Sequence, residues 1–150
     1  MKQTLCCVAV LLFFWGCKNA PLFPIEPEIV FTDIQPKTIK EYQDSISIRF
    51  SFKDGDGDLG DVQGGDRFSL IVKDNRTQFP DSVRTLKFQI PVLNSNTKNP
   101  SILGQITLAY PPTIVTPGYV KDSTTYTIFI YDQAGHKSNE IITDKVYIVR

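Results

Sequence analysis

The stretch that decides the fold class is Ser45-Ile46-Ser47-Ile48-Arg49-Phe50-Ser51-Phe52. Large apolar side chains occupy every second position, and serine or arginine stands between them. Because successive side chains of a β-strand point to opposite faces of a sheet, this alternation predicts a strand with one buried face and one exposed face. We therefore expect residues 45–52 to form a half-buried β-strand.

Six further segments show the same alternation. They are Ile29/Phe31, Phe68/Leu70/Val72, Leu86/Phe88/Ile90, Ile102/Ile106/Leu108, Tyr126/Ile128/Ile130 and Val146/Ile148. Clusters of Gly, Pro, Asp and Asn, which favour turns, separate them. The pattern predicts an all-β fold, an immunoglobulin-like antiparallel β-sandwich of about seven strands, with a small closed barrel as the alternative. The residues expected inside are Ile46, Ile48, Phe50, Phe52, Phe68, Leu70, Ile128 and Ile130.

The first residues have the features of a secretion signal. A short start with one lysine is followed by eleven apolar residues, Leu5–Trp15. As a helix this run would be about 17 Å long, too short for a bilayer core of about 30 Å, so it predicts a cleaved signal peptide. The next residues complete Phe14-Trp15-Gly16-Cys17, which resembles the lipobox of bacterial lipoproteins. The resemblance implies cleavage before Cys17 and acylation of that cysteine; ordinary secretion is the alternative.

These features divide the chain into three parts. We expect residues 1–16 to be a lipoprotein signal peptide, 17–27 a tether and 28–150 the sandwich domain. The tether contains three prolines, which favour an extended chain. Acyl chains on Cys17 would anchor the domain to the outer membrane. Exported surface lipoproteins are expected to carry acidic residues just after the cysteine, whereas the first acid here is Glu26, so the periplasmic side is favoured.

Composition excludes several function classes. The 150 residues contain 16 basic and 16 acidic side chains with no basic run, so nucleic-acid binding is not expected. The single histidine is His136, and no cysteine follows Cys17. A Cys–His nucleophile, a thiolate zinc site and a disulfide framework are therefore excluded from the domain. We expect His136 to be an exposed polar residue and the protein to be non-enzymatic.

Two turns carry a family resemblance. Phe52–Gly60 reads FKDGDGDLG, and Tyr131–Asn139 reads YDQAGHKSN. Together they resemble small Bacteroidota lipoproteins with an immunoglobulin-like domain, which combine a KDGDGDLG-like loop with a late D-x-A-G-N-x-S-N turn. The resemblance implies a fold and a location in the cell envelope, and it implies no particular activity.

The first of these turns is a candidate metal site. Asp54, Asp56 and Asp58 alternate with glycine, so the backbone can curl and direct three carboxylates at one hard cation, for which calcium is the natural candidate. The loop is not an EF-hand, because Leu59 and Gly65 occupy the positions of its obligatory glycine and bidentate glutamate. A solvated turn is the alternative interpretation.

Strand connectivity predicts where further ligands come from. In an up-and-down count of seven strands, the tether, this loop and the late turn share one end of the sandwich. The further oxygen donors expected there are Asp61, Asp66, Asp132 and either Glu26 or Glu28. Asp74 and Asp122 are expected at the opposite end.

Three triplets are similar to the short acceptor used for O-glycosylation in Bacteroidota. Their acceptor residues are Ser45, Ser82 and Ser123, each directly after an aspartate. Ordinary Asp-Ser turn chemistry is the alternative.

The leading hypothesis is a non-enzymatic, lipid-anchored envelope protein that binds an unidentified protein or glycan or has a structural role, with a structural calcium. A carbohydrate-handling accessory lipoprotein and a small hydrolase are the alternatives. A tyrosine platform beside a groove would favour sugar binding, and two carboxylates across a deep pocket would favour an enzyme.

Overall fold

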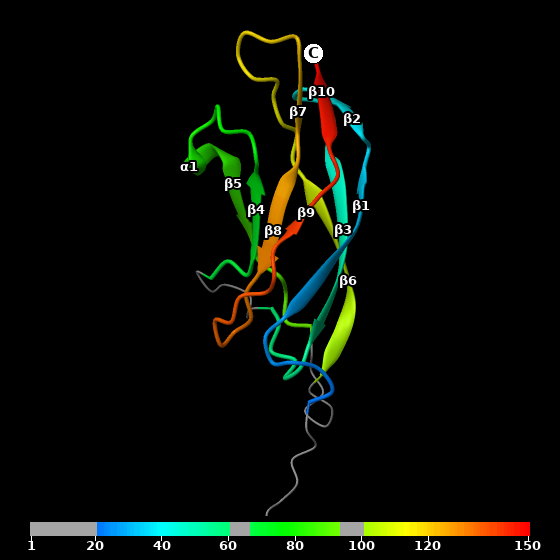
Figure 1. Cartoon of the computed structure of the whole chain (residues 1–150), viewed down its shortest axis with the longest axis vertical. Helices are drawn as coiled ribbons and strands as arrows, with labels where there is room; N and C mark the ends of the chain where they lie inside the picture. Colours follow the sequence, from blue (N-terminus) through cyan, green and yellow to red (C-terminus); the bar gives the residue numbers. More distant parts are fainter. Residues whose placement is uncertain (1–20, 61–66, 94–100) are drawn as a thin grey trace, which may run out of the picture.

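The computed structural model describes residues 21–60, 67–93 and 101–150. In these ranges the chain forms ten strands and one short helix. The strands are β1 (Glu28–Gln35), β2 (Thr38–Lys40), β3 (Ile46–Asp54), β4 (Leu70–Asp74), β5 (Thr85–Phe88), β6 (Ile102–Tyr110), β7 (Lys121–Thr124), β8 (Tyr126–Ile130), β9 (Ile141–Ile142) and β10 (Val146–Val149), and the helix is α1 (Asp81–Arg84). The expected all-β sandwich is confirmed (Figure 1). No helix of the described part is long and apolar enough to cross a membrane.

The strands form two layers. One layer is the sheet β1-β3-β6, and the other combines the sheets β5-β4-β8-β9 and β2-β10-β7. Thr125 alone separates β7 from β8, and residues 143–145 separate β9 from β10. Because β7 pairs with β10 as β8 pairs with β9, the four-stranded sheet and the sheet β2-β10-β7 continue each other. In Figure 1, β4, β5 and β8 lie on the left, and β1, β3 and β6 lie on the right.

Two details of the expected topology are wrong. The pairing between β2 and β10 is parallel, whereas an entirely antiparallel fold was expected. The alternation also did not reveal β2 and β9, which have three and two residues and are too short to display a period, or β7, whose sequence KDST contains no large apolar side chain.

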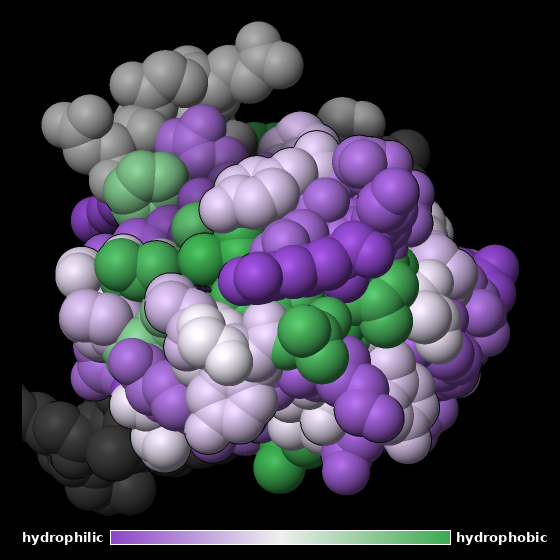
Figure 2. Space-filling view, turned by 90° about the horizontal axis from the view of Figure 1, so that it is seen from above, coloured by the Kyte–Doolittle hydropathy of each residue, from purple (hydrophilic) through white to green (hydrophobic). Residues whose placement is uncertain are grey.

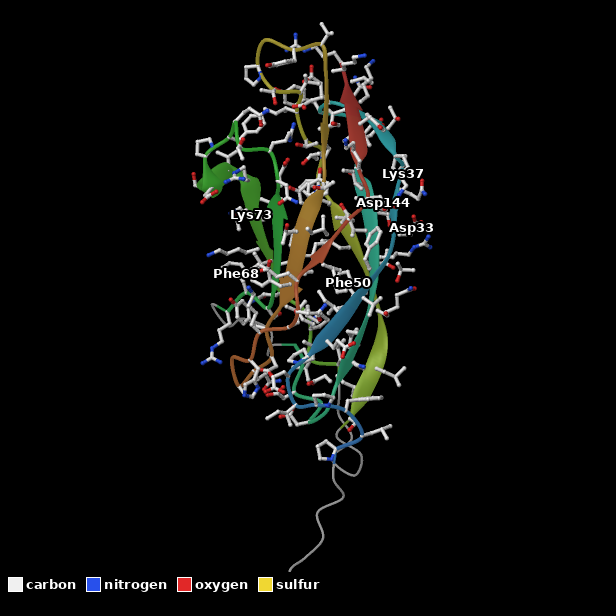
Figure 3. The ribbon with its side chains drawn as sticks, in the orientation of Figure 1. Asp33, Lys37, Phe50, Phe68, Lys73 and Asp144 are labelled. Atoms are coloured by element: carbon white, nitrogen blue, oxygen red, sulfur yellow. The ribbon has the colours of Figure 1, made fainter. Side chains whose placement is uncertain are left out.

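The core lies between the layers and follows the alternation of β3. Seven of the eight expected core residues are buried, namely Ile46, Ile48, Phe50, Phe52, Leu70, Ile128 and Ile130. Phe50 lies between the layers in Figure 3. The prediction for Phe68 is wrong, since this side chain is 49% exposed; β4 begins at Leu70, and Phe68 lies at the margin of the sandwich.

Two hydroxyl groups hold the ends of β8 in place. The Ile130 N–H donates to Ser138 Oγ at 3.0 Å, and the Ser138 N–H donates to the Ile130 carbonyl at 2.9 Å. At the other end, the Tyr126 N–H donates to Thr143 Oγ1 at 3.0 Å, and the Thr143 N–H donates to the Tyr126 carbonyl at 2.9 Å. These contacts satisfy backbone groups where the ladder between β8 and β9 stops. They therefore fix the turn that follows β8.

The end of the molecule that carries the C-terminus has a mixed surface. Seen from above, hydrophobic areas on it are separated by hydrophilic side chains (Figure 2). The C-terminus and residues 21–27 lie at opposite ends of the long axis (Figure 1).

Candidate metal site

The alternation of faces along β3 places an aspartate on the buried face of the sheet. Ile46, Ile48, Phe50 and Phe52 face the core, and Asp54, two positions further, continues the same face. Its side chain is 0% exposed. The expected first ligand of the loop is therefore part of the sandwich interior.

The three expected carboxylates converge. Ligand oxygens of Asp54, Asp56 and Asp58 all lie within 4.8 Å of one another, with Asp56 exposed and Asp58 half-buried. Both oxygens of Asp54 and Oδ1 of Asp58 are buried and have no hydrogen-bond partner among the described residues. A buried carboxylate without a partner is costly. Oxygen donors of this kind and spacing suit a hard cation.

The electrostatics of the cluster oppose its ionised form. Burial raises the pKa of Asp54 to about 6, and the charges of Asp56, Asp58 and Asp132 add to this effect, whereas the nearby Leu59 N–H, which does not reach hydrogen-bond geometry, works against it. Burial also raises the pKa of Asp58, with Asp132 and Asp56 as further causes, whereas an N–H donated by Ala134 to Asp58 Oδ2 at 3.1 Å works against the shift. A bound divalent cation would offset the mutual repulsion of these carboxylates.

Asp132 lies beside the loop, as expected. A β-bridge joins Leu59 to Asp132, and the Gln133 N–H donates to the Asp58 carbonyl at 3.3 Å. Asp132 is already engaged, however: its Oδ1 accepts the His136 N–H, and its Oδ2 contacts His136 Nδ1, both at 2.7 Å. Asp132 thus adds negative charge to the cluster, and its role as a ligand stays a prediction.

His136 belongs to the site, although it was expected only as an exposed polar residue. Its side chain is 37% exposed. The hydrogen bond with Asp132 and the charge of that carboxylate raise the pKa of His136, and Glu26 and Asp56 contribute further. The four-residue spacing of Asp132 and His136 in a turn was the signal for this pair, together with Gly135, whose φ is 92°.

The tether lies against the loop. A Cβ on Gly55 would be 2.2 Å from the Phe23 carbonyl oxygen and 2.4 Å from that of Pro24, so only glycine allows the tether to pass here. Ser101 Oγ accepts the Leu22 N–H at 2.9 Å and donates to the Gly55 carbonyl at 2.8 Å. Residues 21–27 are therefore docked on the domain at the acidic loop.

The remaining expected ligands are Glu26, Glu28, Asp61 and Asp66. Glu26 lies close enough to influence His136, whereas Glu28 forms an ion pair with Lys53 at 2.9 Å. Asp61 and Asp66 lie outside the described residues. The two aspartates expected at the opposite end, Asp74 and Asp122, are there, beyond the start of β8.

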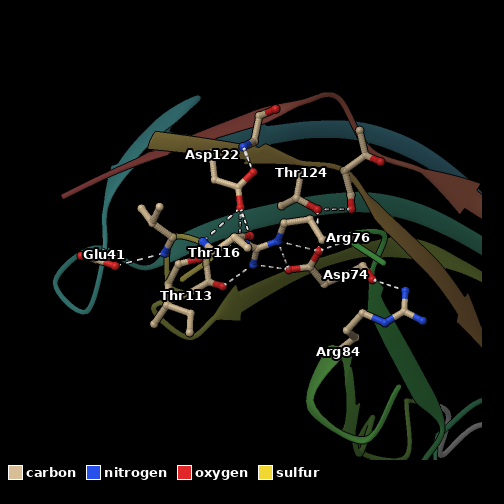
Figure 4. A network of polar contacts seen from close by, with 12 residues as sticks. Glu41, Asp74, Arg76, Arg84, Thr113, Thr116, Asp122 and Thr124 are labelled. Atoms are coloured by element: carbon tan, nitrogen blue, oxygen red, sulfur yellow. Dashed lines mark hydrogen bonds and ion pairs between the residues drawn. The ribbon is translucent and has the colours of Figure 1, made fainter. Parts of the chain in front are cut away.

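Those two aspartates form a buried network around Arg76 (Figure 4). Arg76 Nη2 lies 2.6 Å from Asp74 Oδ2, and Nη1 donates to Asp122 Oδ2 at 3.1 Å. The guanidinium also donates to the Ile114 carbonyl at 2.7 Å and to Thr113 Oγ1 at 2.9 Å. These carboxylates are fully paired, in contrast to Asp54. No pattern in the sequence had indicated Arg76.

The expected modification sites have different exposures. Ser45, before β3, and Ser82, in α1, are exposed, and Ser123, in β7, is half-buried. Their glycosylation stays a prediction. Cys17 lies outside the described residues.

Comparisons with known proteins found no match to the chain among protein-family models, curated proteins or solved structures.

Proposed function

We propose that the protein is a non-enzymatic, lipid-anchored module of the cell envelope whose immunoglobulin-like domain binds calcium at the end next to its tether. The observation that carries the proposal is Asp54, a 0% exposed carboxylate with no hydrogen-bond partner in the described ranges, whose oxygens lie within 4.8 Å of ligand atoms of Asp56 and Asp58. Calcium takes roughly six to eight oxygen ligands in flexible geometry, which suits carboxylates on a glycine-rich loop.

The path of the chain between the layers supports the immunoglobulin-like assignment. The chain crosses from β1 to β2 and back to β3, then to β4, returns to the first layer at β6, and crosses again to β7. Crossings of this kind characterise sandwiches with Greek-key connections.

The docking of the tether supports a structural role for the cation. Gly55 follows Asp54 directly and lies beneath the Phe23 and Pro24 carbonyls. A cation held by the loop would therefore stabilise the surface on which the tether rests. In this role calcium joins the anchor to the domain and takes part in no reaction.

Calcium should raise the melting temperature of the protein, and a chelator should abolish the increase. Extracellular modules bind calcium with dissociation constants of about 10⁻⁴ to 10⁻³ M, so a tenfold excess over that constant stabilises by about 1.4 kcal/mol. Thermal melts should therefore differ by a few degrees. The difference should vanish in Asp56→Asn/Asp58→Asn and persist in Asp144→Asn, a control that removes an exposed acid outside the cluster. Equal melts of the parent with calcium and chelator would contradict the site.

The variant Asp54→Asn tests the same site through an increase in melting temperature without calcium. With chelator present, this variant should melt above the parent, because a neutral amide replaces a buried charge that has no partner. With calcium present it should gain nothing. A variant that melts below the parent in chelator would show that the Asp54 carboxylate is satisfied without a cation.

The lipid anchor predicts a defined N-terminus. Mass spectrometry of the mature protein should find Cys17 as the first residue, carrying acyl chains. Cys17→Ala should move the protein from the membrane fraction to the soluble fraction, whereas Cys7→Ala, within the expected signal peptide, should leave it in the membrane. An unmodified N-terminal peptide that begins elsewhere would refute lipidation.

A further inference from the structure

The outer face of the sheet β5-β4-β8-β9 carries a groove that the cation site does not use. Its floor is an apolar stripe in which Ile71 of β4 lies directly opposite Phe129 of β8. The groove has a volume of about 630 Å³ and is lined by Ile71, Thr127 and Phe129 and, at its rim, by charged side chains. This volume is in the range of ligand sites, roughly 300 to 1,000 Å³.

Aromatic rings follow β8 along this face. The rings of Phe129 and Tyr131 are 5.6 Å apart and nearly perpendicular, at 84°. The ammonium group of Lys137 lies 4.0 Å from the centre of the Phe129 ring, where the π-electrons attract it. The ring therefore positions a cation at the rim of the groove, and Tyr131 continues the aromatic surface beyond it.

The same face carries an excess of positive charge. Lys73, Arg84 and Lys137 line the groove, and Lys87 of β5 lies opposite Ile71. Figure 3 shows Lys73 on the side of this sheet that faces away from Phe50. Within residues 21–60, 67–93 and 101–150, the carboxylates that form ion pairs with these cations are Asp81 and Glu140, both more than half exposed. Exposed pairs of this kind are weak, so Lys73 and Lys137, whose side chains are 39% and 40% exposed, can exchange these partners for the anionic groups of a ligand. Arg84 is only 14% exposed and also donates to the Asp74 carbonyl, so it adds charge to the rim and keeps its own partners.

Neutral hydrogen-bonding groups complete the lining. Asn75, Thr77, Thr85 and Thr127 border the groove. Thr127 Oγ1 donates to Asn75 Oδ1, and Asn75 Nδ2 donates to Thr125 Oγ1, both at 2.9 Å. Amide and hydroxyl groups held in this way can pair with the hydroxyl groups of sugars.

We propose that this groove binds an acidic polysaccharide, a chain of sugars that carry carboxylate groups. The cations match the carboxylates, Ile71 and the part of the aromatic surface that Lys137 does not cover offer an apolar floor to the sugar rings, and the amide and hydroxyl groups match their hydroxyls. An open groove across a sheet admits a chain as well as a single sugar. The proposal goes beyond the anchored calcium module and depends on neither the cation site nor the lipid.

Binding of uronic-acid chains to the detergent-solubilised full-length protein tests this proposal. Polygalacturonate and alginate should bind in calorimetric titrations, and fully methyl-esterified polygalacturonate, which has the same backbone without charge, should not. The titrations contain a chelator, so that their failure leaves the calcium proposal untouched and calcium cannot bridge protein and polymer. Absence of binding to both acidic chains would overturn the proposal.

Two matched double variants locate the site. Lys73→Gln/Lys137→Gln should weaken the binding of the acidic chains at least about tenfold, because each lysine can form charge-assisted hydrogen bonds with a carboxylate. Lys37→Gln/Lys53→Gln removes the same charge from the other side of the sandwich, at side chains of similar exposure (38% and 39%, against 39% and 40%), and should bind like the parent. Equal losses in both variants would overturn the proposal, as would equally tight binding of single-stranded DNA, which would indicate a general polyanion surface.

Discussion

Replacing Arg76 with alanine is expected to lower the free energy of unfolding by about 3 to 5 kcal/mol. The guanidinium is the shared partner of Asp74 and Asp122, and Asp74 is only 4% exposed. Without Arg76, the Asp74 carboxylate would remain in the interior with Thr124 Oγ1 as its side-chain donor, at 2.6 Å. The Ile114 carbonyl would also lose its donor. Urea unfolding followed by circular dichroism measures the loss.

Arg49→Ala is the matched control. Arg49 also pairs with an aspartate at a short distance, 2.7 Å from Asp33, but its side chain is 47% exposed. An exposed ion pair contributes about 0 to 1 kcal/mol. If Arg76→Ala and Arg49→Ala unfold at the same urea concentration, the buried network contributes no more than a surface pair.

Phe50→Ala should also cost about 3 to 5 kcal/mol, because it removes a fully buried ring and leaves a cavity. Phe50 is 0% exposed and stands at the middle of β3, which pairs with both β1 and β6. Phe68→Ala truncates the same side chain at a position that is 49% exposed and should cost much less. Similar unfolding midpoints for the two variants would contradict the position of β3 at the centre of the core.

The alternation of apolar residues predicted those parts of the fold in which strands are long and have one buried face. β3 is the best case, since its neighbours on both sides and the opposite layer impose the same alternation on nine residues. Phe68 stands two positions before Leu70, which is the spacing of successive core residues along a strand, yet it lies before the start of β4. Whether the sandwich extends that far depends on the opposite layer, and a local pattern contains no information about it.

The candidate site was predictable where it consists of one local motif. The alternation of aspartate with glycine indicated Asp54, Asp56 and Asp58, and their convergence is observed. The burial of Asp54 follows from the alternation along β3, in which every second residue from Ile46 is buried, and could have been predicted from that alternation. Arg76 could not be predicted, because its partners Thr113 and Asp122 come from segments that only the folded chain brings to it.

The direct connection of residues 21–27 to the start of β1 has a mechanical consequence. β1 starts at the end of the molecule where residues 21–27 lie and runs towards the opposite end (Figure 1). Its partner β3 is antiparallel to it over seven residue pairs, from Glu28 with Lys53 to Gln35 with Ser47. A pull on the tether therefore acts along the axis of β1 and loads these pairs together in shear, whereas a pull across the strand would open them one after another. A domain loaded through residues 21–27 in this direction therefore resists extension with all seven residue pairs of β1 and β3 at once.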